Sequence, residues 1–243
     1  MARSYGTEAA AAIARAHAVV IGIGGVGSWA AEALARSGIG ALTLIDLDHI
    51  AESNVNRQVH ALGSTLGAAK VSVMAARIHD ISPDCRVQAI DEFIAPANVE
   101  ALVDPTAAVV IDAIDAPRAK AALIALCARR GQAVVVCGAA GGRIDPLALS
   151  RADLTEVRSD ALIAAVRARL RRDHGFPREA GRRFGIEAIW SPAPEGTRGP
   201  PRGEAGAPLA CAGYGSTVMV TASMGLAAAA RAIDRICVPS QRR

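Results

Sequence analysis

The chain has 243 residues, of which 51% are hydrophobic and only 3% aromatic, and its formal net charge is +4. This length allows one large α/β core built from Ala, Val, Leu and Ile, and the small charge is only a weak sign of an anionic partner. The five cysteines include no Cys-x-x-Cys pair, which argues against a zinc ribbon and against a secreted disulfide framework.

A glycine-rich turn near the start of the chain is its most informative feature. After a lead-in with a short helix over residues 8–14, an apolar strand ends in Gly22-Ile23-Gly24-Gly25-Val26-Gly27. The pattern Gly-x-Gly-x-x-Gly before an alanine-rich helix, residues 28–37, predicts a tight turn between a strand and a helix. The free amides at the start of such a helix face a phosphate. A second strand, residues 41–45, delivers Asp46 where such folds bind a ribose. These features predict a nucleotide site without identifying the nucleotide.

The loop after Asp46 is rich in side chains that can bind phosphate. This loop and the helix expected after it, over residues 66–81, carry Asp48, Asn54, Asn56, Arg57, Gln58 and Lys70. A dehydrogenase has no use for several cations around one triphosphate, whereas adenylyl transfer depends on positioning and on neutralisation of charge. Any one of these residues alone could belong to a solvated surface loop. Together they favour ATP over a nicotinamide cofactor.

The middle of the chain continues the alternation of strands and helices. Strands are expected over residues 86–90, 107–111 and 133–136, and helices over residues 95–102 and 116–130. The alternation predicts an α/β fold with a doubly wound, mostly parallel Rossmann-like sheet, whose ligand lies at the carboxyl ends of the strands. Asp112 and Asp115 follow one of these strands, and the Asp115 carboxylate suits Mg²⁺.

The pattern changes after Gly142. We expect residues 1–142 to form the ATP-binding part and residues 143–243 a C-terminal extension of the same domain. The extension is expected to contain a strand in residues 143–151, an arginine-bearing helix over 160–173, a short strand over 187–190, a mobile Pro/Gly-rich loop over 191–208 and a last helix over 214–236.

The sequence also bears on localisation. The first residues lack the charged start and hydrophobic core of a signal peptide. The most apolar late segment, residues 217–233, is interrupted by Ser223, Gly225 and Arg231 and is short for a span of about 20 apolar residues. We therefore expect a cytoplasmic protein without a stable membrane span, and peripheral membrane association stays open.

Several stretches together resemble the E1-like (ThiF, MoeB and HesA) adenylating enzymes. They are the glycine turn, Asp46-Leu47-Asp48, Ser53-Asn54-Val55-Asn56-Arg57-Gln58, Gly67-Ala68-Ala69-Lys70 and Asp112-Ala113-Ile114-Asp115. Within this superfamily the chain is most similar to the tRNA threonylcarbamoyladenosine dehydratases, through residues 27–36, 56–62, 111–115 and 140–146. The resemblance covers nearly the whole chain.

The resemblance implies a reaction and its cofactors. The carboxylate of threonylcarbamoyladenosine, beside a tRNA anticodon, would attack the α-phosphate of ATP and release pyrophosphate. Ring closure on the activated carbonyl would then expel AMP, with net loss of water. The cofactors would be ATP and Mg²⁺ with no structural zinc, and the assembly would be a homodimer.

The resemblance also implies roles for individual residues. Arg57, Lys70 and Asp115 would be catalytic: Asn54, Arg57 and Lys70 would hold the triphosphate, and Asp115 would coordinate Mg²⁺. The residues expected to bind the nucleotide are Gly22, Gly24, Gly25, Gly27, Asp46, Asp48, Asn54, Arg57, Gln58, Lys70, Asp112 and Asp115.

Two further sets of residues are candidates for the tRNA substrate and for covalent catalysis. Seven arginines lie within residues 167–183, and we expect them to bind tRNA phosphates, although a charged run is often only a solvated face; they are Arg167, Arg169, Arg171, Arg172, Arg178, Arg182 and Arg183. Cys211 matches a cysteine of the dehydratase pattern. The E1 analogy would make it a nucleophile, but ring closure needs none, so we favour a structural role.

Alternatives and partners stay open at this point. A sulfur-carrier-protein adenylyltransferase would share the ATP half of the site, but its zinc-binding members carry the Cys-x-x-Cys pairs absent here. An NAD-dependent oxidoreductase is disfavoured by Arg57 and Lys70. The sequence leaves open whether a partner-chain arginine completes the ATP site, for which Arg3 is a weak candidate. It also leaves open whether a cysteine desulfurase and sulfur acceptor system takes part.

Overall fold

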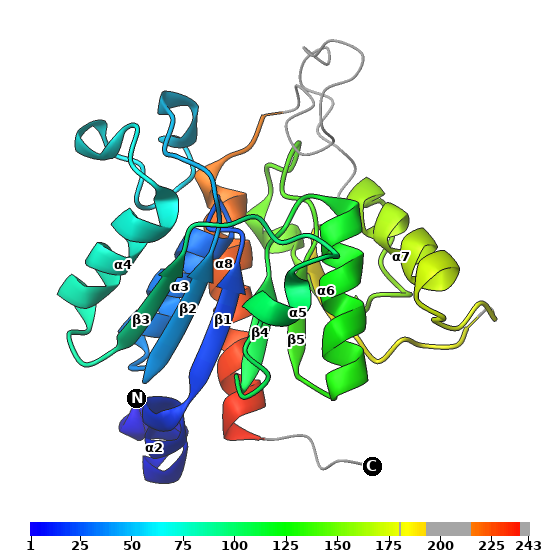
Figure 1. Cartoon of the computed structure of the whole chain (residues 1–243), viewed down its shortest axis with the longest axis horizontal. Coiled ribbons are helices and arrows are strands. Elements are labelled where there is room, and N and C mark those ends of the chain that lie inside the picture. The colour runs from blue at the N-terminus through cyan, green and yellow to red at the C-terminus, as the bar shows by residue number, and fades with distance from the viewer. Residues whose placement is uncertain (180, 193–214, 239–243) are drawn as a thin grey trace.

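A single sheet organises the computed structural model, which describes residues 1–179, 181–192 and 215–238. Its strand order is β3-β2-β1-β4-β5-β7-β6 (Figure 1). The strands are β1 (His17–Ile21), β2 (Ala41–Ile45), β3 (Arg86–Ile90), β4 (Val109–Asp112), β5 (Val134–Cys137), β6 (Ser150–Asp153) and β7 (Glu187–Trp190). Neighbouring strands are parallel except β6 and β7, which are antiparallel. The prediction of a doubly wound, mostly parallel sheet is confirmed.

Helices cover both faces of this sheet, as Figure 1 shows. The first face carries α2 (Thr7–Arg15), α3 (Gly27–Arg36), α4 (Lys70–Ile81) and α8 (Val218–Cys237), and the second carries α5 (Val99–Leu102), α6 (Pro117–Arg130) and α7 (Ala161–Asp173). Because successive side chains of a strand point to opposite faces, Val20 enters the first core while Val19 and Ile21 enter the second. This is why the central strands are apolar without alternation.

The N-terminal residues and the connections add short helices. Residues Ala2–Tyr5 form α1, at the amino ends of the parallel strands (Figure 1). Single 3₁₀ turns lie at Glu52–Asn54, Gly63–Thr65 and Pro146–Ala148. The carboxyl ends of the parallel strands, with the connections that follow them, therefore lie at the opposite end of the sheet from α1.

Several element boundaries differ from the expectations. The helix expected from residue 66 begins at Lys70, because Gly67 has φ +82° and interrupts helical geometry. The strand expected in residues 143–151 is replaced by the 3₁₀ turn at Pro146–Ala148 and by β6, because the Asp145 carboxylate accepts a hydrogen bond from the Leu147 amide and turns the chain. The helix expected over 95–102 is only α5, and the last helix begins at Val218 rather than at residue 214.

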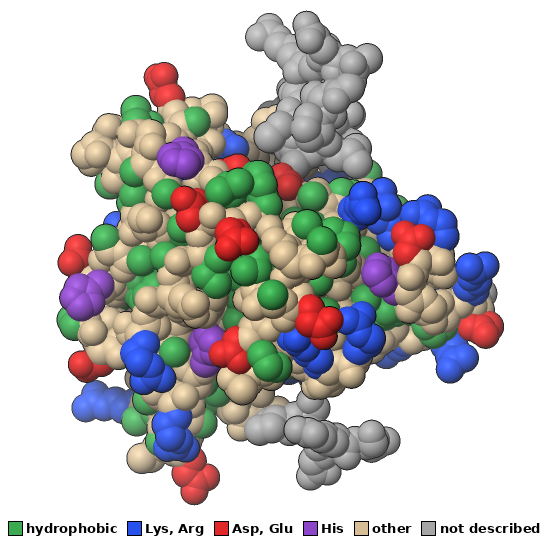
Figure 2. Space-filling model, viewed as in Figure 1, with side chains coloured by type: hydrophobic (Ala, Val, Ile, Leu, Met, Phe, Trp, Pro, Cys, Tyr) green, Lys and Arg blue, Asp and Glu red, His purple; other side chains and the backbone are tan. Residues whose placement is uncertain are grey.

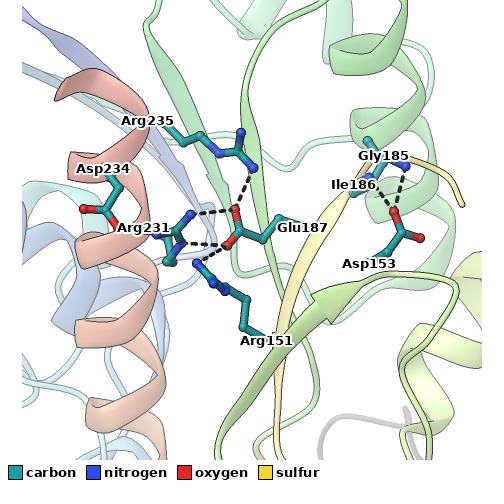
Figure 3. Close-up of polar contacts among 8 residues, drawn as sticks. All are labelled: Arg151, Asp153, Gly185, Ile186, Glu187, Arg231, Asp234 and Arg235. Carbon is teal, nitrogen blue, oxygen red and sulfur yellow. Dashed lines mark hydrogen bonds and ion pairs between the residues drawn. The ribbon is translucent and has the colours of Figure 1, made fainter. Parts of the chain in front are cut away.

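An arginine cluster ties α8 to the edge of the sheet. The Glu187 carboxylate on β7 accepts hydrogen bonds from Arg231 Nε at 2.6 Å and from Arg235 Nη2 at 2.8 Å (Figure 3). Arg151 of β6 lies 3.6 Å from the same carboxylate, whose side chain is only 9% exposed. Burial opposes ionisation of Glu187, but the hydrogen bonds from Arg231 and Arg235 outweigh it and hold its pKa below the ordinary value.

This arrangement predicts a pH-dependent contribution to stability. Glu187→Gln should lower the free energy of unfolding at pH 7 by about 2 kcal/mol, because hydrogen bonds to a charged group contribute about 1.5–3 kcal/mol. The folded-state pKa of Glu187 is depressed, so its contribution is complete above the unfolded pKa and is lost as pH falls through the folded pKa. Urea titrations at pH 7 and in acid measure this difference.

A matched control is available at Glu100, whose side chain is 73% exposed and lies 3.7 Å from Arg130. Glu100→Gln should change the free energy of unfolding little, since exposed ion pairs contribute little. Equal stability of the Glu187→Gln variant and the wild type at pH 7 would contradict the anchoring role of this cluster.

Candidate active site

A cavity of about 530 Å³ lies at the carboxyl ends of the parallel strands. This volume is typical of a site for a small molecule. The connections after β1, β2, β3, β4 and β5 all contribute to its walls. Of the residues predicted from sequence, the cavity brings together Gly22, Gly24, Gly25, Asp46, Asp48, Asn54, Arg57, Gln58, Lys70 and Asp115.

The glycine turn between β1 and α3 is shaped by very close backbone packing. Gly22 has φ +84°, and a Cβ there would lie 2.7 Å from the Ala113 carbonyl oxygen. A Cβ on Gly27 would lie 1.8 Å from the Gly22 carbonyl oxygen. Gly27 does not line the cavity. The close approach at Gly27 lets the first turn of α3 pack on the strand, and its expected contact with the nucleotide stays a prediction.

Asp46 connects the glycine turn to the polar loop. Its Oδ2 accepts a hydrogen bond from the Ile23 amide at 2.6 Å, and its Oδ1 accepts one from the Asp48 amide at 2.8 Å. Burial raises the pKa of Asp46, opposed by the nearby Lys70 ammonium and by the Asp48 amide. The carboxylate is thus held at the cavity wall by two backbone amides, one from each segment.

The cationic side chains of the polar loop are held by the surrounding residues. Lys70 begins α4, and its ammonium lies 2.6 Å from Asp48 Oδ2 with only 6% of the side chain exposed. The Arg57 guanidinium donates to the Ser53 carbonyl at 2.6 Å, and the Arg57 carbonyl accepts a hydrogen bond from the Trp29 indole at 3.0 Å. Both cations therefore line the cavity from pre-organised positions, Arg57 in the loop and Lys70 at the start of α4, which lowers the cost of holding a polyanion.

Two amide side chains behave differently within this loop. Asn54 is buried, and its Oδ1 accepts a hydrogen bond from the Ala51 amide at 3.0 Å, so it stabilises the turn. Gln58 is also buried, and its Oε1 has no hydrogen-bond partner among the described residues. Since a buried polar atom costs free energy unless it is paired, Gln58 is suited to a ligand group in the cavity.

The two carboxylates after β4 have different environments. Asp115 is exposed at the cavity wall. Asp112 is completely buried, lies 3.0 Å from the Lys120 ammonium and does not line the cavity. The Asp112 side chain is thus paired inside the protein with Lys120, and its expected contact with the nucleotide stays a prediction.

Several cavity residues were not expected from the sequence. Glu92, Phe93 and Ile94 follow β3, and Arg143 follows β5. Their position in the sequence could have indicated them, because they follow parallel strands and ligands bind at the carboxyl ends of such strands. Ser216 and Thr221, at the start of the last helix, also line the cavity, and no local pattern indicated them.

The arginines expected to bind tRNA do not form one uniform surface. Figure 2 shows basic side chains gathered at the end of the molecule occupied by α7. Arg167 donates to the Leu154 and Val157 carbonyls at 3.1 and 2.6 Å. Arg171 donates to the Pro177 carbonyl at 3.2 Å, and its guanidinium lies 5.4 Å from the centre of the Phe184 ring. These two guanidiniums therefore hold neighbouring segments of the protein, and their expected contact with tRNA stays a prediction.

Three further predictions concern Cys211, a metal site and a membrane span. Cys211 lies outside the described residues. Among residues 1–179, 181–192 and 215–238 there is no cluster of three or more His, Cys, Asp or Glu side chains suited to a metal. The exposed Asp115 carboxylate at the cavity wall is of the ligand type that suits Mg²⁺ bound together with nucleotide phosphates. Within the same ranges no helix is long and apolar enough to cross a membrane.

Comparison with known proteins adds to this geometry. The ThiF family matches the chain over residues 1–237. The chain belongs to the ThiF family. It is 44% identical to tRNA threonylcarbamoyladenosine dehydratase of Escherichia coli (strain K12), over 100% of this chain and 94% of that protein. It is 38% identical to the protein of the same name from Bacillus subtilis (strain 168), over 77% of this chain and 71% of that protein.

Solved structures of this ThiF family relative agree with the fold. The crystal structure of E. coli tRNA N6-threonylcarbamoyladenosine dehydratase, TcdA, in complex with ATP has a TM-score of 0.88 and 43% identity, over 97% of this chain and 91% of that one. The same protein in complex with AMP has a TM-score of 0.90 and 43% identity, over 100% and 94%.

Proposed function

We propose that this ThiF family protein is an ATP-dependent tRNA threonylcarbamoyladenosine dehydratase, a cyclising enzyme that forms AMP. The observation that carries the proposal is one cavity that unites the glycine turn with Arg57, Lys70 and Asp115. The similarity to named dehydratases over the whole chain, and to a relative solved with ATP and with AMP, supports the choice of substrate and nucleotide.

The proposed reaction activates a carboxylate by adenylation. A carboxylate is a poor electrophile, and joining its oxygen to AMP creates a leaving group. The threonyl carboxylate of the modified adenosine attacks the α-phosphate of ATP, and pyrophosphate leaves. The side chain then closes on the activated carbonyl and expels AMP, so that the net change in the nucleoside is the loss of one water.

The cavity residues have distinct roles in this scheme. Asp46 binds the ribose hydroxyls, and the free amides of the glycine turn lie against the phosphates. Arg57 and Lys70 neutralise the charge that develops on the phosphates. Mg²⁺, when bound with ATP, would supply further neutralisation, and Asp115 is the residue that would hold it. Phe93 and Ile94 provide an apolar wall suited to the adenine base.

Binding and exchange measurements test the ATP half of this proposal. Calorimetric titration should show Mg²⁺-dependent binding of ATP. Exchange of labelled pyrophosphate into ATP should require tRNA that carries threonylcarbamoyladenosine. Saturable binding of NAD without binding of ATP would instead indicate an oxidoreductase. Exchange that requires a small protein with a Gly-Gly tail, and not tRNA, would indicate a sulfur-carrier-protein adenylyltransferase.

The tRNA footprint is proposed on the exposed arginines of α7 and of the segment after it. Arg172 and Arg183 have side chains 61% and 69% exposed, and Arg169 is 36% exposed. Each phosphate contact adds roughly 0.7–0.9 to the slope of log affinity against log salt. The double variant Arg169→Glu/Arg172→Glu should therefore weaken tRNA binding and reduce this slope by about 1.5, while ATP affinity is unchanged.

Binding titrations at several salt concentrations measure this effect. Arg129→Glu is a matched charge reversal on the exposed end of α6, away from the cavity, and should leave both the affinity and the slope unchanged. A double variant that keeps the wild-type salt slope would place the tRNA footprint on another surface.

Assembly and partners are also proposals. α1, which carries Arg3, lies at the opposite end of the sheet from the cavity (Figure 1). Arg3 could therefore complete only the site of a second copy, as a homodimer would allow. A cysteine desulfurase and sulfur acceptor system stays a proposed partner.

A further inference from the structure

A buried ammonium lies beneath the loop that carries Asp115. Lys120, at the end of the first turn of α6, and Asp112, at the end of β4, are both 0% exposed. Lysine is almost never fully buried unless it is paired. The Lys120 ammonium lies 3.0 Å from Asp112 Oδ1, and it donates to the Asp112 carbonyl at 3.1 Å and to the Ile114 carbonyl at 3.0 Å. Its three N–H donors therefore have three partners.

These partners belong to the last residue of β4 and to the connection between β4 and α6. Asp112 Oδ1 also accepts a hydrogen bond from the Ile114 amide at 3.1 Å. Ala116, the N-cap of α6, makes no side-chain capping hydrogen bond. Within residues 113–116, the Ile114 amide and carbonyl are therefore held by the carboxylate and ammonium beneath the loop, while the Ala113 amide bonds to the Ile21 carbonyl of β1.

The same loop forms part of the cavity wall. Ala113, Ile114, Asp115 and Ala116 line the cavity, whereas Lys120 and Asp112 do not. The backbone of Ala113 also packs closely on the glycine turn at Gly22. A small change in this loop would therefore move the Asp115 carboxylate relative to the phosphate-binding turn, and misplacement by an ångström is costly at a catalytic centre.

A buried ion pair is weak evidence for stability, because well-packed apolar residues often stabilise a protein as much. The Lys120–Asp112 pair lies at the end of β4, beneath a loop of the cavity wall, and this location points to a role in positioning that loop. We propose that Lys120 is a positioning residue, whose ammonium fixes the loop after β4 so that the Asp115 carboxylate meets the metal-bound nucleotide. This inference rests on the proposed function, which assigns Asp115 to Mg²⁺ and ATP.

The test compares ATP affinity in Mg²⁺ with ATP affinity in a chelator, by calorimetry on the full chain. Lys120→Met should bind ATP in the chelator as the wild type does, because the glycine turn, Arg57 and Lys70 are intact. Its gain in affinity on adding Mg²⁺ should fall about tenfold, the loss expected for one charge-assisted contact. Asp115→Asn should reproduce this pattern, since both changes affect the same carboxylate.

Folding is controlled with a second variant. Lys120→Met leaves Asp112 as an unpaired buried charge, which destabilises a protein strongly. The double variant Lys120→Met/Asp112→Asn removes that charge and should recover much of the lost thermal stability. Its gain in ATP affinity on adding Mg²⁺ should stay about tenfold below that of the wild type, because the Asp112 and Ile114 carbonyls remain without their donor. Arg118→Met, on the exposed side of α6, should match the wild type in both measurements.

The outcomes separate the inference from the proposed function. A wild-type protein that does not bind ATP in either condition would refute the ATP half of the proposed function, and one that binds ATP without a Mg²⁺-dependent gain would refute the assignment of Asp115. If the wild type shows the gain and the double variant keeps it, the positioning role is overturned. An equal loss of affinity in Mg²⁺ and in the chelator would also overturn it, since that is the result of a merely structural role.

Discussion

Replacing Arg57 with alanine should lower the turnover number of tRNA cyclisation about a hundredfold, because one charged donor at a phosphate that gains charge contributes roughly 3 kcal/mol to the transition state. The guanidinium is partly exposed, and it donates hydrogen bonds within its own loop, to the Ser53 carbonyl and the Asn56 side chain. The free energy of unfolding should therefore change little. Steady-state cyclisation rates, with urea titrations in parallel, measure both quantities.

Lys70→Ala provides an informative comparison. It should lose turnover to a similar extent and, unlike Arg57→Ala, also lose stability, because the Lys70 ammonium is buried against Asp48. Arg36→Ala removes a guanidinium that is 59% exposed on α3 and should retain wild-type turnover. Normal turnover in both Arg57→Ala and Lys70→Ala would show that this cavity does not perform the adenylation.

Gly27→Ala should abolish ATP binding and lower the free energy of unfolding by about 3 kcal/mol, at the upper end of the cost of overpacking. The new Cβ would lie 1.8 Å from the Gly22 carbonyl oxygen, which is backbone and cannot move aside as a flexible side chain can. Either α3 or the glycine turn must shift, and both hold the amides that face the phosphates. Calorimetry and urea titration of the variant measure the two effects.

Gly63→Ala is the matched control for this change. A Cβ at Gly63 meets nothing within 4 Å, and its φ does not lie in the left-handed region. This variant should bind ATP and unfold as the wild type does. Wild-type ATP affinity in Gly27→Ala would mean that the nucleotide does not depend on the glycine turn.

The sequence predicts the sheet because its signals are local and agree with one another. The strands β1, β2 and β4 are mostly apolar, and each leads into a glycine turn or an acidic residue at the expected edge of the sheet. The predicted strand over residues 187–190 is β7 with the same bounds. Its neighbours β5 and β6 in the sheet are fixed by long-range pairing, which no local pattern shows.

The candidate site is predicted less completely, because the burial of a side chain and the direction in which it points depend on tertiary structure. Asp112 and Asp115 belong to one short motif, yet only Asp115 faces the cavity. In the sequence, Arg167 and Arg171 cannot be told apart from Arg169 and Arg172, since all four lie in one arginine-rich segment. In the structure, the guanidiniums of Arg167 and Arg171 donate hydrogen bonds to backbone carbonyls of neighbouring segments. The contribution of Thr221 to the cavity arises from packing of α8 on α3, two segments far apart in the chain.

The most direct test of the central claim is mass spectrometry of the nucleosides released from tRNA that carries threonylcarbamoyladenosine, after incubation with the purified protein. With ATP and Mg²⁺, the modified nucleoside should be converted to a product lighter by one water, and one AMP and one pyrophosphate should form for each product. Without ATP, or with NAD in its place, the nucleoside should be unchanged. An unchanged nucleoside in the presence of protein, ATP and Mg²⁺ would contradict the account.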